Sequence, residues 1–279
     1  MKKSLIVFTN GREETWPAVE YAAWLAAASG TPLTLVGVVE RAARREAVES
    51  MLARGQALAG GRVSCDVRVE EGIMDEVIIR AGAHDADAML VFGPYRRVSI
   101  RQWLFGDSFR NVMANVAAPI LHVPRAVLPP KNILVCVGGL GYTVPAEALG
   151  VEIAALSKAQ LSLLHVVPPI NLDYPTARQV SAHVDDLLES DTPPGRAMRQ
   201  AVRLARDAGL NPSVRICQGH ILDEIRAEIQ RGRYDLVCMG STYSAHGLRH
   251  LTAPNITAEV AHSANCAVLS ARFVETGDD

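Results

Sequence analysis

The sequence has few aromatic residues and almost no net charge, and both absences limit what it can bind. Phe, Trp and Tyr make up only 5% of the 279 residues, too few for a platform on which bases stack. The formal net charge is −2, whereas a nucleic-acid-binding protein would carry a basic surface. We therefore expect no nucleic-acid partner.

Long apolar runs and paired cysteines are also missing. No apolar stretch reaches the ~18 residues that a membrane span requires, so we expect none. Lys2 and Lys3 precede only the short apolar run Leu5–Phe8, which is not a signal peptide. The cysteines form no Cys-x-x-Cys pair, which is typical of reduced, mostly buried thiols in a cytoplasmic protein. They are Cys65, Cys136, Cys217, Cys238 and Cys266.

What the sequence does contain is an internal repeat. The apolar run Leu5–Thr9 reads as a buried strand, and a second such run, Ile133–Val137, lies 128 positions later. The same offset joins many further pairs, among them Gly11/Gly139, Thr15/Thr143, Pro17/Pro145, Leu33/Leu161 and Val39/Val167. One register held over this length predicts two copies of one domain.

Further along, the offset grows to 147, which joins Gly72 to Gly219 and Gly93 to Gly240. The second copy is therefore longer by about 19 residues, with the insertion near 168–212. Pro168-Pro169 and Thr192–Gly195 lie in it, and we interpret it as a longer connection with a short helix near Val180–Glu189. Ala126–Lys131 forms the junction, so the predicted domains are 1–127 and 131–273.

Each copy alternates apolar strands with helices, which predicts parallel sheets covered on both faces. The expected fold class is α/β, with two tandem doubly wound parallel five-stranded sheets. In such sheets ligands bind at the carboxyl ends of the strands, here Thr9–Arg12, Val38–Glu40 and the loop after Phe92. In the first copy we expect strands at 4–9, 33–39, 63–69, 88–92 and 119–123, and helices at 16–29, 41–59, 73–84 and 106–117. Thr15 and Thr143 are the expected N-caps of equivalent helices.

The loop after Phe92 carries a family signal. It reads Gly93-Pro94-Tyr95-Arg96 and, nine residues later, Gly106-Asp107-Ser108. This resembles the G-x2-G-x9-G-[ST] motif of ATP-binding members of the universal stress protein family. Leu5–Arg12, Ala118–Val123 and Leu164–Val167 are similar to the first, fifth and second strands of that family.

The resemblance covers both copies and implies the universal stress protein fold, which is adenine nucleotide alpha hydrolase-like. It implies an intramolecular pseudo-dimer in which the fifth strands, Pro119–Val123 and Ala267–Ala271, pair with each other. It also implies a site for ATP or AMP in the first copy, although no cofactor is required. The residues of that site are Asn10, Gly11, Val38, Gly93, Arg96, Gly106, Asp107 and Ser108.

This site departs from the family pattern at three positions. Asn10 replaces an Asp that contacts the nucleoside, Arg96 replaces the second Gly, and Asp107 replaces the Ser or Thr beside the phosphates. A carboxylate repels a polyphosphate, whereas guanidinium groups pair with it. Arg96, Arg97 and Arg101 either offset the repulsion by Asp107 or form a solvated face of the loop.

The second copy departs further from the pattern. Gly138 stands at the Asp position, and Ala253-Pro254-Asn255 occupies the region of the third Gly. Because proline has no N–H to donate to a phosphate, we expect no ATP binding of the family type in this copy. It would then be a structural partner of the first copy.

Other motifs indicate no chemistry. Gly138-Gly139-Leu140-Gly141 lacks the third glycine of a dinucleotide site, because Val144 stands there, and a tight turn is the better interpretation. His246 and His250 are four apart without further ligands nearby, so we expect no metal site. His165 reads as a core residue. No Ser-His-Asp or Cys-His signature appears, so we expect no enzyme.

We therefore expect a tandem universal stress protein that binds a small ligand or a protein partner without turnover. One alternative is an ATP- or AMP-binding protein with slow ATP hydrolysis in the first copy only. The other is a structural scaffold in which both sites are vestigial. Two chains could also pair as a homodimer. A stress-response role follows from the family resemblance alone.

Overall fold

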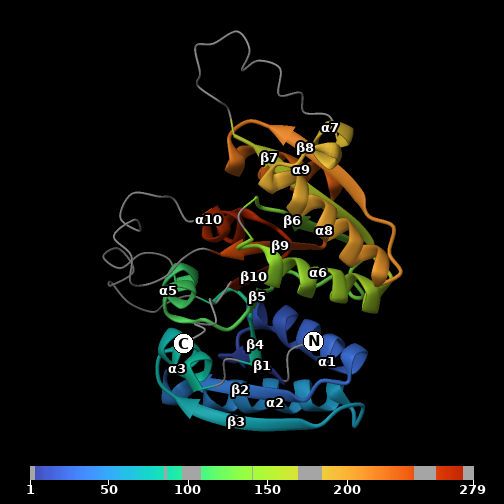
Figure 1. Ribbon diagram of the computed structural model, residues 1–279. Coiled ribbons are helices and arrows are strands. Elements are labelled where there is room, and N and C mark those ends of the chain that lie inside the picture. Colours follow the sequence, from blue (N-terminus) through green and yellow to red (C-terminus); the bar gives the residue numbers. More distant parts are fainter. Residues whose placement is uncertain are drawn as a thin grey trace, which may run out of the picture.

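A single ten-stranded sheet runs through the whole chain in the computed structural model (Figure 1). The structure describes residues 4–84, 87–95, 108–139, 141–168, 184–241 and 256–272. The strands of the first half are β1 (Ser4–Thr9), β2 (Leu33–Val39), β3 (Cys65–Glu71), β4 (Ala88–Phe92) and β5 (Ile120–His122). Those of the second half are β6 (Asn132–Cys136), β7 (Gln160–Val167), β8 (Ser213–Gln218), β9 (Leu236–Ser241) and β10 (Ala267–Arg272).

Each half is a parallel, doubly wound sheet, as the alternation of strands and helices predicts. The strand order is β3-β2-β1-β4-β5 in the first half, and the second half repeats it as β8-β7-β6-β9-β10. The order reverses direction between β1 and β4, and again between β6 and β9. The carboxyl ends of these strands are the places where the fold leaves room for a ligand.

The two sheets join through an antiparallel pair, β5 with β10. Leu121 lies opposite Leu269, with His122 opposite Val268 and Ile120 opposite Ser270. The pairing of fifth strands implied by the family resemblance is thus confirmed within this chain. Neither β5 nor β10 is left as an open edge, which would otherwise be a template for association with other chains.

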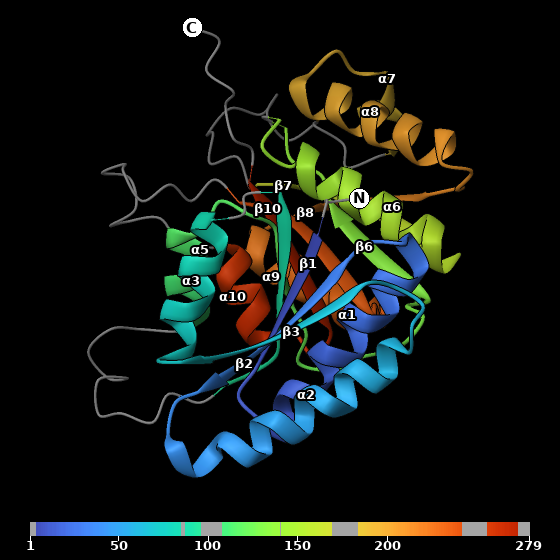
Figure 2. The ribbon, with the colours of Figure 1, turned by 90° about the horizontal axis from the view of Figure 1, so that it is seen from below.

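Four long helices cover one face of the sheet: α1 (Trp16–Ser29), α2 (Arg45–Ala59), α6 (Val144–Ser157) and α8 (Pro193–Asp207), with α7 (Val184–Glu189) beside α8. The other face carries α3 (Met74–His84), α5 (Ser108–Asn115), α9 (Ile221–Gly232) and α10 (Ile256–Ser263). Figure 2 shows these two layers on either side of the strands. No helix within the described ranges is long and apolar enough to cross a bilayer.

Each face has one hydrophobic core that is continuous across both halves. The first core combines side chains under α1 and α2 with side chains under α6 and α8. The second combines those under α3 and α5 with those under α9 and α10. Helices also meet at the junction, where α1 contacts α6 and α5 contacts α10. Since a small domain buries little surface alone, joining the cores adds stability to each half.

The element boundaries differ slightly from the expected ones. The third strand begins at Cys65 rather than at position 63, and a 3-10 turn, Ala42–Arg44, precedes α2. The helix expected at Val180–Glu189 is α7, whose described part begins at Val184. Residues 106 and 107, expected to open the helix before β5, lie outside the described residues.

Thr15 and Thr143 stand at the N-cap positions of α1 and α6, as predicted, but neither side chain makes a capping hydrogen bond. Both residues precede their helices with helical backbone angles, φ −91° and ψ −10° for Thr15 and φ −92° and ψ −12° for Thr143. An N-cap hydroxyl reaches the first-turn N–H groups from an extended backbone. Here Thr15 Oγ1 instead donates to Arg12 O at 2.7 Å, and Thr143 Oγ1 donates to Glu147 Oε1 at 2.6 Å.

The segment Thr192–Gly195 begins a helix instead of continuing the inserted connection. Thr192 is the N-cap of α8, with its Oγ1 accepting from Gly195 N at 3.3 Å, and the two prolines fill the first turn. Residues 168–192 separate β7 from α8, whereas only residues 40–44 separate β2 from α2. The extra residues of the second half therefore precede α8, which is the counterpart of α2.

The continuous cores predict that the two halves unfold together. Leu163 on β7 is fully buried in the second half, and Leu163→Ala should lower the free energy of unfolding by about 2–5 kcal/mol. All three tryptophans, Trp16, Trp24 and Trp103, lie in the first half. Their fluorescence should therefore report a lower urea midpoint that coincides with the midpoint from far-UV circular dichroism.

A matched control is Val67→Ala on β3, where the side chain is 39% exposed and the midpoint should move little. If Leu163→Ala leaves the fluorescence midpoint unchanged while circular dichroism gains an earlier transition, the halves unfold independently and the prediction is wrong.

Candidate functional site

Strand register brings part of the predicted first-half site together. Thr9 on β1 pairs with Gly37 on β2, so Asn10 follows β1 beside Val38. Phe8 pairs with Phe92 on β4, so Gly93 lies beside the end of β1 on its other side. Asn10, Gly11, Val38 and Gly93 thus meet at the switch point of the first sheet.

The rest of the predicted site cannot be placed in the same way. Arg96, Gly106 and Asp107 lie outside the described residues, as do Arg97 and Arg101. Ser108 is the first residue of α5. The phosphate-binding part of the family site therefore stays a prediction from sequence.

Asn10 is the polar group at the end of β1, and it is only 3% exposed. Its Oδ1 accepts a hydrogen bond from Arg12 N at 3.3 Å, which identifies the other side-chain atom as the NH₂ group. That Nδ2 is buried and has no hydrogen-bond partner among the described residues. A buried donor without a partner is destabilising, and a ligand that accepts from it would remove this penalty.

The other residues at this point shape the site with their backbones. Gly11 has φ +71°, and a Cβ there would lie 2.6 Å from Val48 N in the first turn of α2. A Cβ on Gly93 would lie 2.9 Å from Glu14 O. Val38 is fully buried, so its side chain offers no surface to a ligand. The tight approaches require glycine and leave Asn10 as the side chain of this group that can hydrogen-bond.

A pocket of about 150 Å³ opens beside Asn10. Its lining residues are Asn10, Arg12, Glu40, Arg41 and Arg44, which come from the ends of β1 and β2 and from the approach to α2. The sequence places Arg12 and Glu40 in the expected ligand-binding regions but gives no reason to single out Arg41 and Arg44. The one sequence feature that could have indicated them is that both arginines stand in the short connection directly after β2.

An aromatic cluster, which the sequence analysis did not predict, lies at the carboxyl ends of β4 and β5. Phe92 lies edge-on to Tyr95 and to His122, with ring centroids 5.9 and 5.8 Å apart, and Phe109 lies 6.0 Å from Phe92. These rings come from β4, the loop after it, α5 and β5. They form an apolar support under the start of the loop that holds the family motif.

The second half is built differently at the equivalent point. Gly138 and Gly139 follow β6, and a Cβ on Gly139 would lie 2.8 Å from Pro194 Cγ at the start of α8. Gly141 has φ +78° and its carbonyl oxygen accepts from Val144 N at 3.2 Å, so a turn leads from Gly141 into α6. A pocket of about 220 Å³ opens here between the amino ends of α6 and α8. Its lining includes Thr143, Glu147, Arg196 and Gln200.

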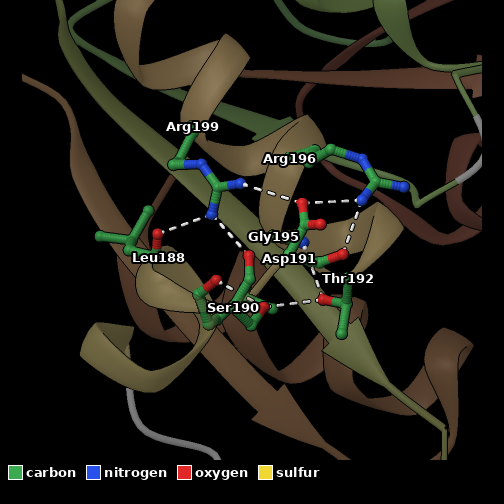
Figure 3. A network of polar contacts seen from close by, with 8 residues as sticks. Leu188, Ser190, Asp191, Thr192, Gly195, Arg196 and Arg199 are labelled. Atoms are coloured by element: carbon green, nitrogen blue, oxygen red, sulfur yellow. Dashed lines mark hydrogen bonds and ion pairs between the residues drawn. The ribbon is translucent and has the colours of Figure 1, made fainter.

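A polar network fixes α8 over this turn (Figure 3). Arg196 Nη1 donates to Asp191 Oδ1 at 2.8 Å, and this bond, together with the charge of Arg196, lowers the pKa of Asp191. Arg199 Nη1 donates to the carbonyl oxygens of Leu188 and Ser190 at 2.8 and 2.6 Å. These bonds tie the end of α7 to the first turns of α8. Pro194 therefore lies beside Gly139, next to the pocket of this half.

Glu147 is a buried carboxyl group in the second-half pocket, with 3% exposure. Thr143 Oγ1 donates to it at 2.6 Å and accepts from Gly138 N at 3.0 Å. Burial raises the pKa of Glu147, and the Thr143 hydrogen bond opposes the rise. The equivalent position in the first half, at an offset of 128, is the buried Val19. The glutamate at the position of a core valine was the sequence feature that could have revealed this buried carboxyl group.

The remaining candidates take no part in either site. His165 is a core residue, as expected: it is 8% exposed, and its Nδ1 lies 2.8 Å from Val137 O. All five cysteines are free, but only Cys238 and Cys266 are fully buried, and the others are half-buried. Burial raises the pKa of Cys136 to about 12, which makes it a poor nucleophile.

His246 and His250 lie outside the described residues, as does the segment Ala253-Pro254-Asn255. Within the ranges that the structure describes, no three His, Cys, Asp or Glu side chains gather in a geometry suited to a metal ion.

Comparisons with known proteins agree with this architecture. The sequence profile of the Universal stress protein family matches residues 1–124 and 130–272. No curated relative matches the chain. A universal stress protein from Archaeoglobus fulgidus DSM 4304 superposes with a TM-score of 0.69 at 13% identity, over 99% of this chain and 98% of its own. A functionally unknown protein from Pseudomonas aeruginosa PAO1 superposes with a TM-score of 0.66 at 18% identity, over 97% and 92%.

Glu147 predicts a specific dependence of stability on pH. Because its folded-state pKa is raised, the folded protein holds the proton more tightly than the unfolded chain, and stability falls as the pH rises through the folded-state pKa. Glu147→Gln does not ionise and keeps an acceptor for Thr143. Its melting temperature should exceed that of the wild type at about pH 7.5, and the difference should shrink toward about pH 4.5.

Glu189→Gln, at an exposed position on α7, serves as the control and should show no such trend. A difference between Glu147→Gln and the wild type that stays constant with pH would refute the buried-carboxyl account.

Proposed function

Because the chain belongs to the universal stress protein family, we propose that it acts by binding a small ligand or a protein partner, without turnover. The ligand site of this proposal lies in the first half, at the carboxyl ends of β1, β2 and β4. The second half serves as its structural partner. The stress-response role and the cytoplasmic location belong to the same proposal, and the five free cysteines support the location.

The observation that carries the proposal is the unsatisfied amide of Asn10. Its buried Nδ2 has no partner among the described residues, and Asn10 lines a pocket at the switch point. Structures retain such a group where it has a use, since an apolar residue of similar shape would avoid the penalty. Gly11 and Gly93 let the backbones of α2 and of Glu14 pack closely against this strand end, which fixes the position of Asn10.

The absence of turnover rests on the chemistry of the same group. The family pattern has a carboxylate that contacts the nucleoside at the end of the first strand, whereas this chain has a carboxamide, which departs from the pattern of the ATP-binding members. The sequence also puts Asp107 beside the expected phosphate position, where its charge opposes a polyphosphate.

The contrast with the second half supports a single working site. There Pro194 and the first turns of α8 lie against Gly139, and the network of Asp191, Arg196 and Arg199 holds them in place. In addition, Pro254 stands in the region of the third motif glycine. This half contributes the continuous core and the pairing of β5 with β10.

A thermal unfolding experiment tests the proposal with millimolar AMP, ADP and ATP plus magnesium. A ligand that binds only the folded state raises stability by ~2.7 kcal/mol at a hundredfold excess over its Kd. We expect a rise in melting temperature with at least one nucleotide, and no ADP formed from ATP over hours.

Gly106→Val should abolish that rise, because a side chain at this motif position blocks the approach of phosphates. Ala253→Val, at the corresponding region of the second half, is the matched control and should keep it. Steady formation of ADP would support the alternative of slow hydrolysis. No rise with any of the three nucleotides would leave the scaffold as the better account of the nucleotide site.

A further inference from the structure

Three arginines line the first-half pocket. Arg12 follows β1, and Arg41 and Arg44 lie in the connection from β2 to α2. None of their guanidinium groups takes part in an ion pair or hydrogen bond within the described part of the chain. Other arginines of the same half do pair: Arg54 Nη1 lies 2.7 Å from Glu13 Oε1, and Arg45 contacts Glu71. Three guanidinium groups without a partner among the described residues are thus gathered at the pocket.

Two further features add donors and positive potential at the same place. Asn10 lines the pocket, and its buried Nδ2 has no hydrogen-bond partner among the described residues. The first turn of α2, a helix of 15 residues, lies directly beside it, because Gly11 packs against Val48 N. Arg44, the N-cap residue, makes no side-chain capping bond to that turn. The amino end of a helix carries a partial positive charge that favours anions.

The pocket lining also contains one negatively charged residue, Glu40, which offsets part of the positive charge of the arginines. Its Oε1 accepts from Met74 N at 3.4 Å, at the start of α3. Three guanidinium groups against one carboxylate leave the pocket with an excess of two positive charges at neutral pH. Its volume of about 150 Å³ is below the ~300 Å³ at which pockets for whole small molecules begin. The space therefore suits one anionic group rather than a nucleoside.

We propose that this pocket binds a phosphate group of a small phosphorylated molecule, held by Arg12, Arg41, Arg44 and the Asn10 amide. Guanidinium groups bind phosphate oxygens through paired, charge-assisted hydrogen bonds, and the Asn10 NH₂ gains the acceptor that it lacks. The inference rests on the proposed ligand-binding role of the first half and adds the chemical class of the ligand. It does not use the glycine motif at Gly93–Ser108.

The test is isothermal titration of the full-length protein with inorganic pyrophosphate at about 0.01 M and about 0.15 M ionic strength. We expect saturable binding of one pyrophosphate per chain that weakens with salt. Arg41→Ala/Arg44→Ala should lose at least about tenfold in affinity, since each lost charge-assisted bond contributes about tenfold. Because neither side chain has a partner among the described residues, the melting temperature without ligand should stay unchanged.

Two variants distinguish specific binding in this pocket from nonspecific electrostatic attraction of pyrophosphate to the protein surface. Arg62→Ala/Arg68→Ala removes the same charge from exposed positions of the same half and should keep the affinity. Asn10→Asp adds a carboxylate at the pocket and should weaken pyrophosphate strongly, although it restores the residue that the family pattern uses toward a nucleoside. Circular dichroism of each variant checks that it is folded.

Gly106→Val distinguishes this inference from the proposed function. We expect it to bind pyrophosphate like the wild type even where it no longer responds to nucleotides. The inference is overturned if pyrophosphate does not bind, if both arginine pairs reduce binding equally, or if Gly106→Val alone abolishes it. In the last case the anion sits in the glycine motif, and the proposed function stands without this pocket.

Discussion

The antiparallel contact between β5 and β10 is the interaction on which the rest of the molecule depends. It is short, with three residue pairs, yet it converts two small sheets into one. At its centre Leu121 and Leu269 are fully buried and belong to the core that α1, α2, α6 and α8 cover. The contact also sets the helices of the junction against each other on both faces. Each half therefore has a larger core than its own length would allow.

Within this frame the two strand ends have diverged. The first keeps an open end, with Asn10, three arginines and the amino end of α2 around a pocket. In the second, the longer segment before α8 allows that helix to begin with Pro193 and Pro194 directly over the turn after β6. The duplication thus separates two roles. In our proposal the first half holds the ligand, whereas in the second half Pro194 lies against Gly139 and a pocket of different lining opens beside it.

The sequence was sufficient for the fold but not for the pocket. The offsets between apolar strands predicted two doubly wound sheets, and the family resemblance predicted that the fifth strands would pair. The side-chain bonds at the N-caps were not predicted: the hydroxyls of Thr15 and Thr143 donate to Arg12 O and to Glu147, three and four residues away, instead of bonding the first-turn N–H groups. The pocket could not be predicted from the sequence, because Arg12 and Arg41 follow different strands. Only the register of β1 with β2 brings these two residues together.

The central claim is that ligand binding belongs to the first half alone. Hydrogen–deuterium exchange of the full chain, with and without saturating pyrophosphate, tests it most directly. The account predicts slower exchange in the segments 9–12 and 38–48, at the ends of β1 and β2 and the start of α2, with no change at 138–147 or 193–200. Protection of the second-half segments instead, or no protection anywhere at saturation, would contradict it.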